Sequence, residues 1–456
     1  VVKRLSDATR AGDRIHAVIE GLGIASGGGI TPPRPSRTAW RRAIDAALLD
    51  AGVDGDRIGL VVTGTSGAPE EDATEAHALS TVRLGRTGRP ASLTSPAERV
   101  GHAGAAAGLV SVLHAVQALA NDTLPPFPPG PRLRGNGEQE LGRRYRLAPA
   151  AEPWLTDTSD GPRRALAGCG GLDGNVAQVV LREGGPAAAR ITQASPLRTV
   201  ETRPAVFVLE GGGDSDLLRA LESLERSLPA APDAPVVDLA RRWLDERPVD
   251  RSRPRALALV APTAAGLRSR IERSRAAIHG SISREEAERD PKDGATVFGN
   301  ATPLGHVGTV ALLFPGSGND HAQQGRDLLA RFPEVWRALD STTTCLRSQL
   351  PTDALWPTHP GPVFAPTELE RILGHVTVAS LAAGLLEHVG VRPSAALGYS
   401  LGETASMFAL GVWRDRDAML RRLSDSDLFT RDLAGPCRAA ARHWQLPAGE
   451  PARWQS

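Results

Sequence analysis

The sequence predicts a mixed α/β fold class spread over about three domains. Short apolar runs rich in β-branched residues alternate with longer segments whose apolar residues recur at helical spacing, which is typical of layered α/β proteins. Turns rich in Gly and Pro separate these segments, and the chain contains 48 Gly and 36 Pro. The length of 456 residues corresponds to about three domains at ~150 residues each. A single small binding module is therefore excluded.

The formal charge is almost balanced, which argues against a nucleic-acid partner. The chain carries 53 Lys and Arg against 52 Asp and Glu, a net charge of +1, and 41% of its residues are hydrophobic. These values exclude an electrostatic nucleic-acid binder and a highly charged disordered chain as first interpretations. Almost all the basic residues are Arg, because Lys occurs only at Lys3 and Lys292.

The three cysteines favour a reducing compartment. Cys169, Cys345 and Cys437 lie far apart and show no CxxC spacing, so neither a disulfide framework nor a zinc site is indicated. No stretch approaches ~20 apolar residues, and the first residues lack the apolar core of a signal peptide. We therefore expect a cytoplasmic protein with no membrane contact and no bound metal. Since the chain begins without Met, in what reads as the end of a strand, we expect a fragment of a longer polypeptide.

The first region, residues 1–184, shows the alternation most clearly. Strand, helix and strand in its opening stretch point to a layered α/β domain. A later helix opens with small residues that let it pack closely on neighbouring backbone. One face of it carries an apolar stripe of Leu109, Val112, Leu113, Val116 and either Leu119 or Ala120. The expected elements are a strand within 13–23, a helix over 37–51, a strand over 58–62, a helix over 101–121 and a strand over 176–181.

The second region, residues 185–305, is expected to be a small α/β linker domain. A strand over 206–209 and an amphipathic helix over 214–227 are too patterned for a flexible tether. The glycines at 211–213 follow the strand but do not form G-x-G-x-x-G, so a dinucleotide site is not indicated. The third region, residues 306–456, starts at a buried strand over 310–314.

A nucleophile elbow is the strongest local signal of the third region. Residues 398–402 read Gly-Tyr-Ser-Leu-Gly, which fits G-x-S-x-G, with a strand expected over 393–397 and a helix over 403–410. The Ser must lie on a tight strand-to-helix turn, where a Cβ at either glycine would clash with the neighbouring chain. The helix N-terminus then points at the reacting centre, where backbone N–H groups and the dipole stabilise a developing oxyanion.

The residues around this elbow resemble a known transferase family. Residues 398–403 resemble the G-H-S-x-G-E signature of malonyl/acyl-CoA:acyl-carrier-protein transacylases, with Tyr399 where the family usually has His. Residues 314–320 are similar to that family's F-P-G-Q-G-x-Q, and residues 325–328 resemble the G-R-D-L that follows. Two signatures in the family's order are much harder to obtain by chance than one. The resemblance implies a partial acyltransferase domain of α/β-hydrolase-like fold.

The resemblance also implies the roles of individual residues. Ser400 would take an acyl group from coenzyme A and pass it to the phosphopantetheine thiol of an acyl carrier protein, with no tightly bound cofactor. The backbone N–H groups of Leu401 and Ser317 would form the oxyanion hole, which does not require the family's Gln side chain at position 317. The residues implied for acyl or CoA binding are Gly316, Gly318, Tyr399 and Arg422.

Two departures from the family pattern concern the substrate carboxylate and the general base. The family's Arg that grips the malonyl carboxylate falls on Asp425, and Arg421 or Arg422 could take its place only with a shifted helix. The family's general-base His lies farther downstream than this chain extends, and His443, the only His after Ser400, reads as a surface residue on a helix. Because a Ser hydroxyl is a poor nucleophile without a base, we expect the isolated chain to be inactive.

The first region resembles the C-terminal half of a β-ketoacyl synthase, which implies a thiolase-like fold. Residues 3–8 and 13–19 are similar to K-R-L-S-D-A and D-R-I-Y-A-V-I. Residues 101–108 look like G-H-x-E-A-A-A-G, and residues 170–175 stand where F-G-G-T-N-A-H would be.

The groups that condensation needs are largely replaced in this resemblance. The family's Cys belongs to the other half of the synthase, its first His falls on Thr63, and its Lys falls near Ala97. Only the second His is kept, as His102, and it reads as a structural residue. Neither Lys3 nor Lys292 stands where the family's Lys is needed. Such losses in a preserved scaffold are typical of a chain-length factor, which pairs with an active ketosynthase.

The combination implies a larger assembly. A chain-length factor followed by a transacylase resembles the multidomain polyunsaturated-fatty-acid synthases and related iterative polyketide synthases, as does the tail over 426–437. The implied partners are an acyl carrier protein and a ketosynthase domain, with a homodimer formed through the ketosynthase-like region.

Two other functions stay open. One is a catalytically inactive fragment that serves as a dimerisation and docking scaffold, favoured by Thr63, Ala97 and the missing downstream His. The other is an ordinary α/β-hydrolase esterase, which would need an Asp and then a His after Ser400, where only His443 is available.

Two further groups of residues read as structural. The acidic run Glu70, Glu71 and Asp72, with His77, reads as a solvated loop rather than a metal site. Cys437 reads as an ordinary buried or half-buried thiol.

Overall fold

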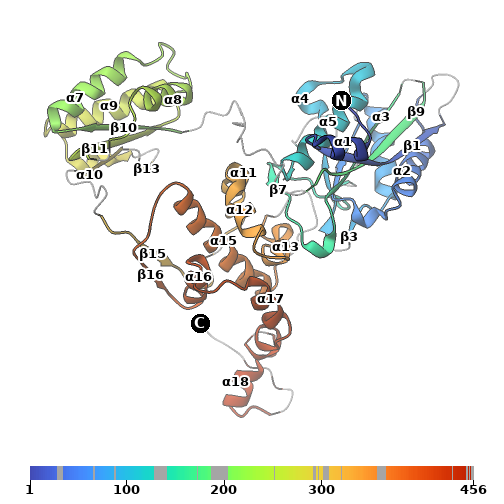
Figure 1. Cartoon of the computed structure of the whole chain (residues 1–456). Helices are drawn as coiled ribbons and strands as arrows, with labels where there is room; N and C mark the ends of the chain where they lie inside the picture. Colours follow the sequence, from blue (N-terminus) through green and yellow to red (C-terminus); the bar gives the residue numbers. More distant parts are fainter. Residues whose placement is uncertain are drawn as a thin grey trace. The chain divides into compact units, whose positions relative to one another are not determined.

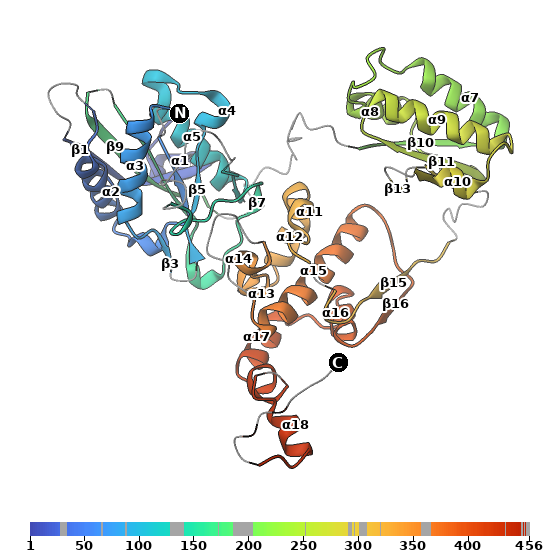
Figure 2. The same ribbon diagram turned by 180° about the vertical axis from the view of Figure 1, so that it is seen from behind.

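The chain divides into two units by its internal packing, and each is described by itself (Figures 1 and 2). The first unit comprises Val1–Gln193 with Ala311–Ser456, and the second comprises Ala194–Val310. The predicted division into three regions stays a prediction. The computed structural model describes residues 1–27, 34–64, 67–86, 89–127, 141–171, 173–185, 204–250, 252–290, 294–295, 297–300, 308–319, 321–356, 366–433, 435–447, 450 and 452. Three motif positions named above, Leu172, Asp320 and Ala434, lie outside these residues, and so does Lys292.

A five-stranded sheet forms the centre of the first region. Its order is β1 (Ala17–Ser26), β9 (Asn175–Glu183), β8 (Arg164–Gly170), β2 (Leu60–Val62) and β5 (Ser92–Thr94). β2 runs parallel to both β5 and β8, while β9 runs antiparallel to β8 and β1. Because parallel strands end at the same edge, the loops after β2, β5 and β8 meet there.

Helices cover both faces of this sheet. α2 (Arg37–Ala51) and α3 (Pro69–Thr81) pack on one face around Ile44 and Leu79, whereas α5 (Ala107–Ala120) packs on the other around Ala115 and Leu119. The shorter elements of this region are α1 (Leu5–Ala11), α4 (Ala97–Val100), η1 (Gly55–Arg57), η2 (Gly104–Ala106), η4 (Thr158–Asp160), β3 (Gly85–Arg86), β4 (Arg89–Pro90), β6 (Thr123–Leu124) and β7 (Glu152–Pro153).

The α2 helix forms over the residues that the sequence predicts, and local signals explain both of its ends. Ser36 Oγ accepts from the Ala39 N–H at the start, and Gly52 in the left-handed conformation ends the helix. Gly21 and Gly23 let β1 approach α2, because a Cβ on either would lie 2.3 or 2.0 Å from a helix carbonyl oxygen. The other strands predicted in this region form within a few residues of their expected positions.

Two expectations for the first region are wrong. Residues 70–72 lie in the first turn of α3 and not in a solvated loop, because Pro69 and acidic side chains suit a helix N-terminus. In α5, Leu109 and Leu113 are 68% and 59% exposed, whereas Leu119 is buried. The predicted apolar stripe is therefore split between a face packed on the sheet and an exposed face.

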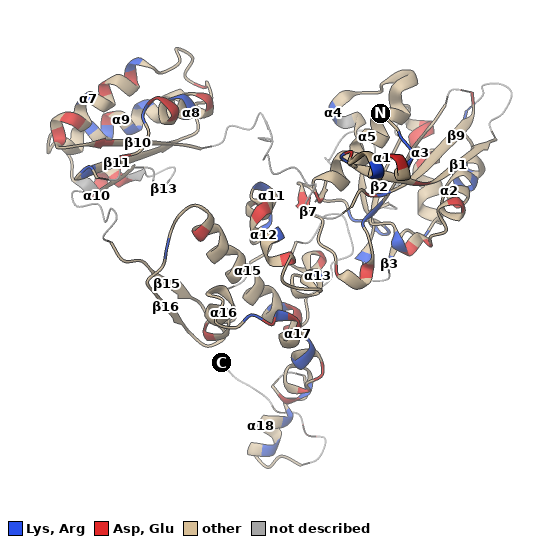
Figure 3. Cartoon of the chain, viewed as in Figure 1, with Lys and Arg blue, Asp and Glu red and all other residues tan. Residues whose placement is uncertain are grey.

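The second unit is a three-stranded antiparallel sheet with helices on one side. β11 (Arg255–Ala261) is the central strand and pairs with β10 (Ala205–Gly211) and β14 (Val297–Asn300). Figure 3 shows charges of both signs along the covering helices, whose inner sides bury Leu221 and Ile271 with Phe207 of the sheet. The remaining elements are α7 (Asp214–Arg226), α8 (Val237–Glu246), α9 (Ala264–Ile278), α10 (Arg284–Glu288), β12 (Arg289–Asp290) and β13 (Gly294–Ala295).

The third region is built around two parallel strands, β15 (Ala311–Phe314) and β16 (Ala395–Gly398). Both strands form where the sequence predicts them, to within two residues at their ends. The expectation that the first of them is buried is wrong, because Leu313 is 72% exposed and only Phe314 is buried. The helices of the region are α11 (Arg326–Arg331), α12 (Pro333–Asp340), α13 (Leu346–Gln349), α14 (Thr352–Leu355), α15 (Glu368–His388), α16 (Leu401–Ala409), α17 (Arg416–Ser424), the π-helix η6 (Leu428–Asp432) and α18 (Arg438–His443).

Among the described helices, α15 is long and apolar enough to cross a membrane by length and composition alone. It is nevertheless not a run of ~20 apolar residues, because Glu368 and Glu370 stand in its first turn. Val376 on this helix is buried with Phe314 and Ala405, and Leu381 is buried with Trp336. Such packing is what the core helix of a globular region shows, so the absence of membrane contact stays our prediction.

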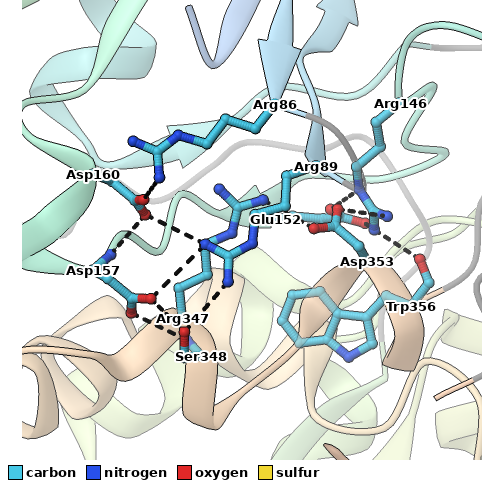
Figure 4. Close-up of polar contacts among 10 residues, drawn as sticks. All are labelled: Arg86, Arg89, Arg146, Glu152, Asp157, Asp160, Arg347, Ser348, Asp353 and Trp356. Atoms are coloured by element: carbon cyan, nitrogen blue, oxygen red, sulfur yellow. Dashed lines mark hydrogen bonds and ion pairs between the residues drawn. The ribbon is translucent and has the colours of Figure 1, made fainter. Parts of the chain in front are cut away.

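A buried polar seam joins the first region to the third within the first unit (Figure 4). Arg146 holds Glu152 in two hydrogen bonds of 3.0 and 2.9 Å. The same guanidinium reaches the third region through Asp353 at 3.4 Å and the Trp356 carbonyl at 2.7 Å. We define the seam as Arg86, Arg89, Arg146, Glu152, Asp157, Asp160, Arg347, Ser348, Asp353 and Trp356.

A pocket beside the seam is lined by seven arginines. Each of them lies 3.8 Å or less from a carboxylate oxygen. Because every positive charge has its counter-charge, this lining offers no free cationic site for an anion.

Candidate active site

Ser400 occupies a strained turn between β16 and α16. Its φ of 54° and ψ of −119° lie outside the regions that residues with a Cβ ordinarily adopt. The Gly402 N–H donates to the Tyr399 carbonyl and the Glu403 N–H to the Ser400 carbonyl, so the helix starts directly at the serine. This is the strand–turn–helix geometry of a nucleophile elbow, and the catalytic role of Ser400 stays a prediction.

The glycines on either side of Ser400 leave no room for side chains. A Cβ on Gly402 would lie 2.1 Å from the Phe314 carbonyl oxygen, and a Cβ on Gly398 would lie 2.4 Å from the Glu403 backbone nitrogen. These neighbours are backbone atoms, which cannot move aside as the end of a flexible side chain can. The steric reason that the sequence gives for both glycines is therefore confirmed.

Two backbone N–H groups near Ser400 have no acceptor in the described part of the chain. A Cβ built on Gly316 would lie only 3.3 Å from the Ser400 Cβ, so the loop after β15 packs directly against the turn. Within the described residues, neither the Ser317 N–H nor the Leu401 N–H donates to a protein acceptor. Free N–H groups beside a nucleophile can stabilise an oxyanion. Gly316 and Gly318, the latter with a φ of 86°, form the loop that carries one of them.

The described residues bring no general base to Ser400. The Ser400 hydroxyl has no hydrogen-bond partner among them. His443 is exposed at the end of α18, which lies apart from the β16–α16 turn in both views (Figures 1 and 2). Tyr399, beside the nucleophile, is 76% exposed.

The α17 helix carries the arginines considered for the acyl carboxylate. Arg421 and Arg422 are exposed on its last turn, and no contact ties either of them to Ser400 among the described residues. The helix is anchored at its other end by Arg416, which donates to Gln349 Oε1 at 2.9 Å and to the Thr377 hydroxyl at 2.6 Å. Burial lowers the pKa of Arg416 to about 10. Binding of an acyl group by Arg422 stays a prediction.

Three positions singled out in the first region gather at one edge of the sheet. Thr63 follows β2, Ala97 begins α4 after β5, and His102 follows α4. Thr63 is buried, and its hydroxyl donates to the Thr94 carbonyl at 3.3 Å. His102 is exposed, and its Nδ1 accepts from the Gly104 N–H at 3.3 Å. Of the three side chains, only that of His102 carries ring nitrogens that can donate or accept a hydrogen bond.

Two buried carboxylates of α3 shape this edge: Glu75, which the sequence did not single out, and Asp72, which was expected in a solvated loop. Glu75 accepts from the Gly64 N–H at 2.7 Å, and Asp72 accepts from the Gly67 N–H at 3.2 Å, so both hold the loop after β2 from the buried side of α3. Burial, with the Glu75 charge, raises the pKa of the Cys169 thiol at the end of β8. Across the described ranges, no group of three or more His, Cys, Asp or Glu side chains could hold a metal ion.

Comparison with known proteins identifies the first region. Residues 16–129 match the beta-ketoacyl synthase C-terminal domain. The pikromycin polyketide synthase component PikAII of Streptomyces venezuelae is 33% identical over 447 residues, which cover 95% of this chain and 11% of the relative. The spectinabilin polyketide synthase system protein NorA of Streptomyces orinoci is 31% identical over 443 residues, covering 92% and 21%. Residues 16–129 of the first region are a ketosynthase C-terminal region.

The chain that contains this ketosynthase region spans only part of each relative. It covers 11%, 22%, 21% and 26% of the length of four of them, among which is the 5-methyl-1-naphthoate synthase of Streptomyces sahachiroi. A solved ketosynthase, from module 6 of the bacillaene synthase of Bacillus subtilis 168, aligns at 20% identity with a TM-score of 0.35, over 75% of this chain and 54% of that one.

The ketosynthase match confirms the resemblance that the sequence predicts for the first region, and the mixed sheet and helices confirm the α/β class. The ketosynthase region keeps its strands and helices while Thr63 and Ala97 occupy the edge of its sheet. The side chains of Thr63 and Ala97 carry neither a charge nor a ring nitrogen.

Proposed function

We propose that this chain is part of a polyketide or polyunsaturated-fatty-acid synthase in which Ser400 transfers an acyl group of malonyl type from CoA to an acyl carrier protein. The main support for this proposal is the backbone conformation of Ser400. A φ of 54° at the head of α16 costs conformational energy, and such strain persists where it exposes a reacting group.

The transfer takes two steps. Ser400 Oγ attacks the thioester carbonyl, the new C–O bond forms as the C–S bond breaks, and CoA leaves as a thiol with the proton of the serine hydroxyl. The phosphopantetheine thiol of the carrier protein then attacks the ester, gives its proton back to Ser400 and carries the acyl group away. The N–H groups of Leu401 and Ser317 would stabilise the oxyanion in both steps. No tightly bound cofactor is required.

The ketosynthase region would sit beside this reaction without condensing. Thr63 has no imidazole to replace that of the family's first His, and Ala97 has no ammonium group to replace that of the family's Lys. We propose that the region acts as a chain-length factor, forms a homodimer in the full synthase and pairs with an active ketosynthase domain in the cytoplasm.

Acyl labelling tests the role of Ser400. The polypeptide that carries this chain is incubated with radiolabelled malonyl-CoA or acetyl-CoA, and the labelled peptide is identified after digestion. We expect label on the peptide containing Ser400, a loss of more than about 100-fold in Ser400→Ala, and full labelling in Ser424→Ala, which removes an exposed serine of α17. Undiminished labelling of Ser400→Ala would rule out Ser400 as the nucleophile.

A scaffold without catalysis is the second candidate. It is favoured by the Ser400 hydroxyl, which has no hydrogen-bond partner in the described part of the chain. Wild-type protein that stays unlabelled by every acyl-CoA but forms a stable dimer would support this function instead.

A further inference from the structure

Two side chains hold consecutive peptide groups of the loop after β15. The Pro315 carbonyl oxygen lies 2.9 Å from Nε2 of His375 on α15. The next carbonyl oxygen, that of Gly316, accepts from Nδ2 of Asn319 at 3.0 Å. His375 lies far from both signatures along the chain, so the sequence did not single it out, whereas Asn319 stands at the variable position of the first signature.

The contact with Pro315 determines that Nε2 of His375 carries a proton. A carbonyl oxygen can only accept a hydrogen bond, so Nε2 must be the donor and must carry the proton. That nitrogen then has no lone pair with which to take the proton of Ser400. His375 therefore acts on this loop as a hydrogen-bond donor.

Holding a carbonyl also sets the direction of the neighbouring N–H. In a planar trans peptide the C=O and N–H bonds point in opposite directions. The bond from Asn319 to the Gly316 carbonyl therefore directs the Ser317 N–H, and the bond from His375 to the Pro315 carbonyl directs the Gly316 N–H. Glycine permits many backbone conformations, so the loop needs these bonds to keep a single orientation.

The loop held in this way touches the nucleophile turn. A Cβ on Gly316 would lie 3.1 Å from the Tyr399 carbonyl oxygen and 3.3 Å from the Ser400 Cβ. Rotation of the Gly316–Ser317 peptide would exchange the directions of the Ser317 N–H and the Gly316 carbonyl. A carbonyl dipole facing a developing oxyanion opposes the reaction that an N–H would assist.

We propose that His375 and Asn319 are positioning residues, which orient the Ser317 N–H as an oxyanion donor for the acyl transfer proposed above for Ser400. They act through the backbone of the loop and do not touch the acyl group. Their role rests on that proposed function, but the state of the loop can be measured without it.

The first test is independent of acyl transfer. Amide ¹⁵N order parameters of Gly316 and Ser317 are compared in wild type, His375→Leu, His375→Gln, Asn319→Ala and His388→Leu. Gln places an amide donor near the position of Nε2, and His388→Leu makes the same change in the last turn of the same helix. We expect about 0.85 in wild type, His375→Gln and His388→Leu, and less than about 0.6 in His375→Leu and Asn319→Ala. Equal values in His375→Leu and wild type would overturn the proposal.

The second test measures the rate of Ser400 acylation at saturating acyl-CoA. We expect His375→Leu to lower this rate about tenfold or more with an unchanged KM, and His375→Gln to restore it to within about threefold. If His375→Gln is as slow as His375→Leu, and the wild-type rate follows protonation of an imidazole, then His375 is a general base and the positioning role is wrong. If the wild type is never acylated, the function of Ser400 fails, while the order parameters still decide the role of His375. Thermal melting of each variant verifies that it folds.

Discussion

The half-buried His114 links the stability of the ketosynthase region to pH. It lies on α5, and its Nε2 is 3.2 Å from the Thr94 hydroxyl, which donates its own proton to the Pro126 carbonyl at 2.9 Å. The Thr94 oxygen therefore accepts from Nε2–H of a neutral imidazole. Burial, and to a smaller extent the Arg99 charge, lowers the pKa of His114 to about 4.

This lowered pKa predicts a loss of stability in mild acid. The unfolded chain, in which the pKa of His114 is 6.5, binds the proton first, so the contribution of His114 is complete above pH 6.5 and is lost as the pH falls through 4. By pH 5 the loss is about 2 kcal/mol. We expect His114→Gln to flatten the dependence of the unfolding free energy on pH between 7.5 and 5 by that amount, measured by urea denaturation. Parallel pH curves for the two proteins would contradict this.

Single residues were predictable where the chemistry is local in sequence. The turn at Ser400 follows from glycines two places away on each side, so the pentapeptide contains the whole steric argument. His375 and Glu75 act on loops reached only through the tertiary fold, and each is one polar residue on an otherwise ordinary helix. No spacing rule connects such residues to their partners, and the sequence could not have placed them in a site.

Helices and strands were predictable to the extent that their ends carry local signals. The helix over Arg37–Ala51 has a Ser cap and a terminal Gly, and it was predicted to the residue. For α3, the acidic first turn was mistaken for a solvated loop. For α5, Leu109 and Leu113 are exposed although they have the spacing of core residues. Periodicity shows that a face is apolar, but it does not show which surface covers that face.

The close contact between β15 and α16 at the elbow should make the stability sensitive to a side chain at Gly402. Since a Cβ on Gly402 would lie 2.1 Å from the Phe314 carbonyl oxygen, Gly402→Ala must push the strand and the helix apart. We expect it to lower the free energy of unfolding by roughly 1–3 kcal/mol, measured by urea denaturation. Gly213→Ala is the control, because nothing lies within 4 Å of a Cβ built there. Equal costs for the two variants would show that the close approach does not constrain the elbow.

No sequence pattern indicates that the ketosynthase region and the third region share one unit. They are separated along the chain by the second unit, whose core of Phe207, Leu221, Leu259 and Ile271 is its own. The seam joins the two regions through charged residues. From sequence alone such residues are expected at the surface, because charged side chains are almost never fully buried unless they are paired. Arg146 and Glu152 are nevertheless only 5% and 1% exposed.

Removing one partner of this buried pair should cost far more than removing both. Burial lowers the pKa of Arg146, but the Glu152 and Asp353 charges outweigh it and the net direction is upward, so the guanidinium stays charged. Arg146→Met leaves the Glu152 carboxylate buried without its partner, and we expect a loss of about 3–5 kcal/mol. The double variant Arg146→Met with Glu152→Met should recover most of that loss, because no buried charge of the pair is left.

Calorimetry of the whole chain decides whether the seam makes the two regions cooperative. We expect them to unfold in one transition in wild type and in two in Arg146→Met. Lys3→Met removes the exposed Lys3–Asp13 pair of the same unit and should cost no more than about 1 kcal/mol. A cost for Arg146→Met no larger than that of Lys3→Met, with a single transition in both, would mean that the two regions are held together by the apolar contacts around Leu155 and Trp336 and not by the seam.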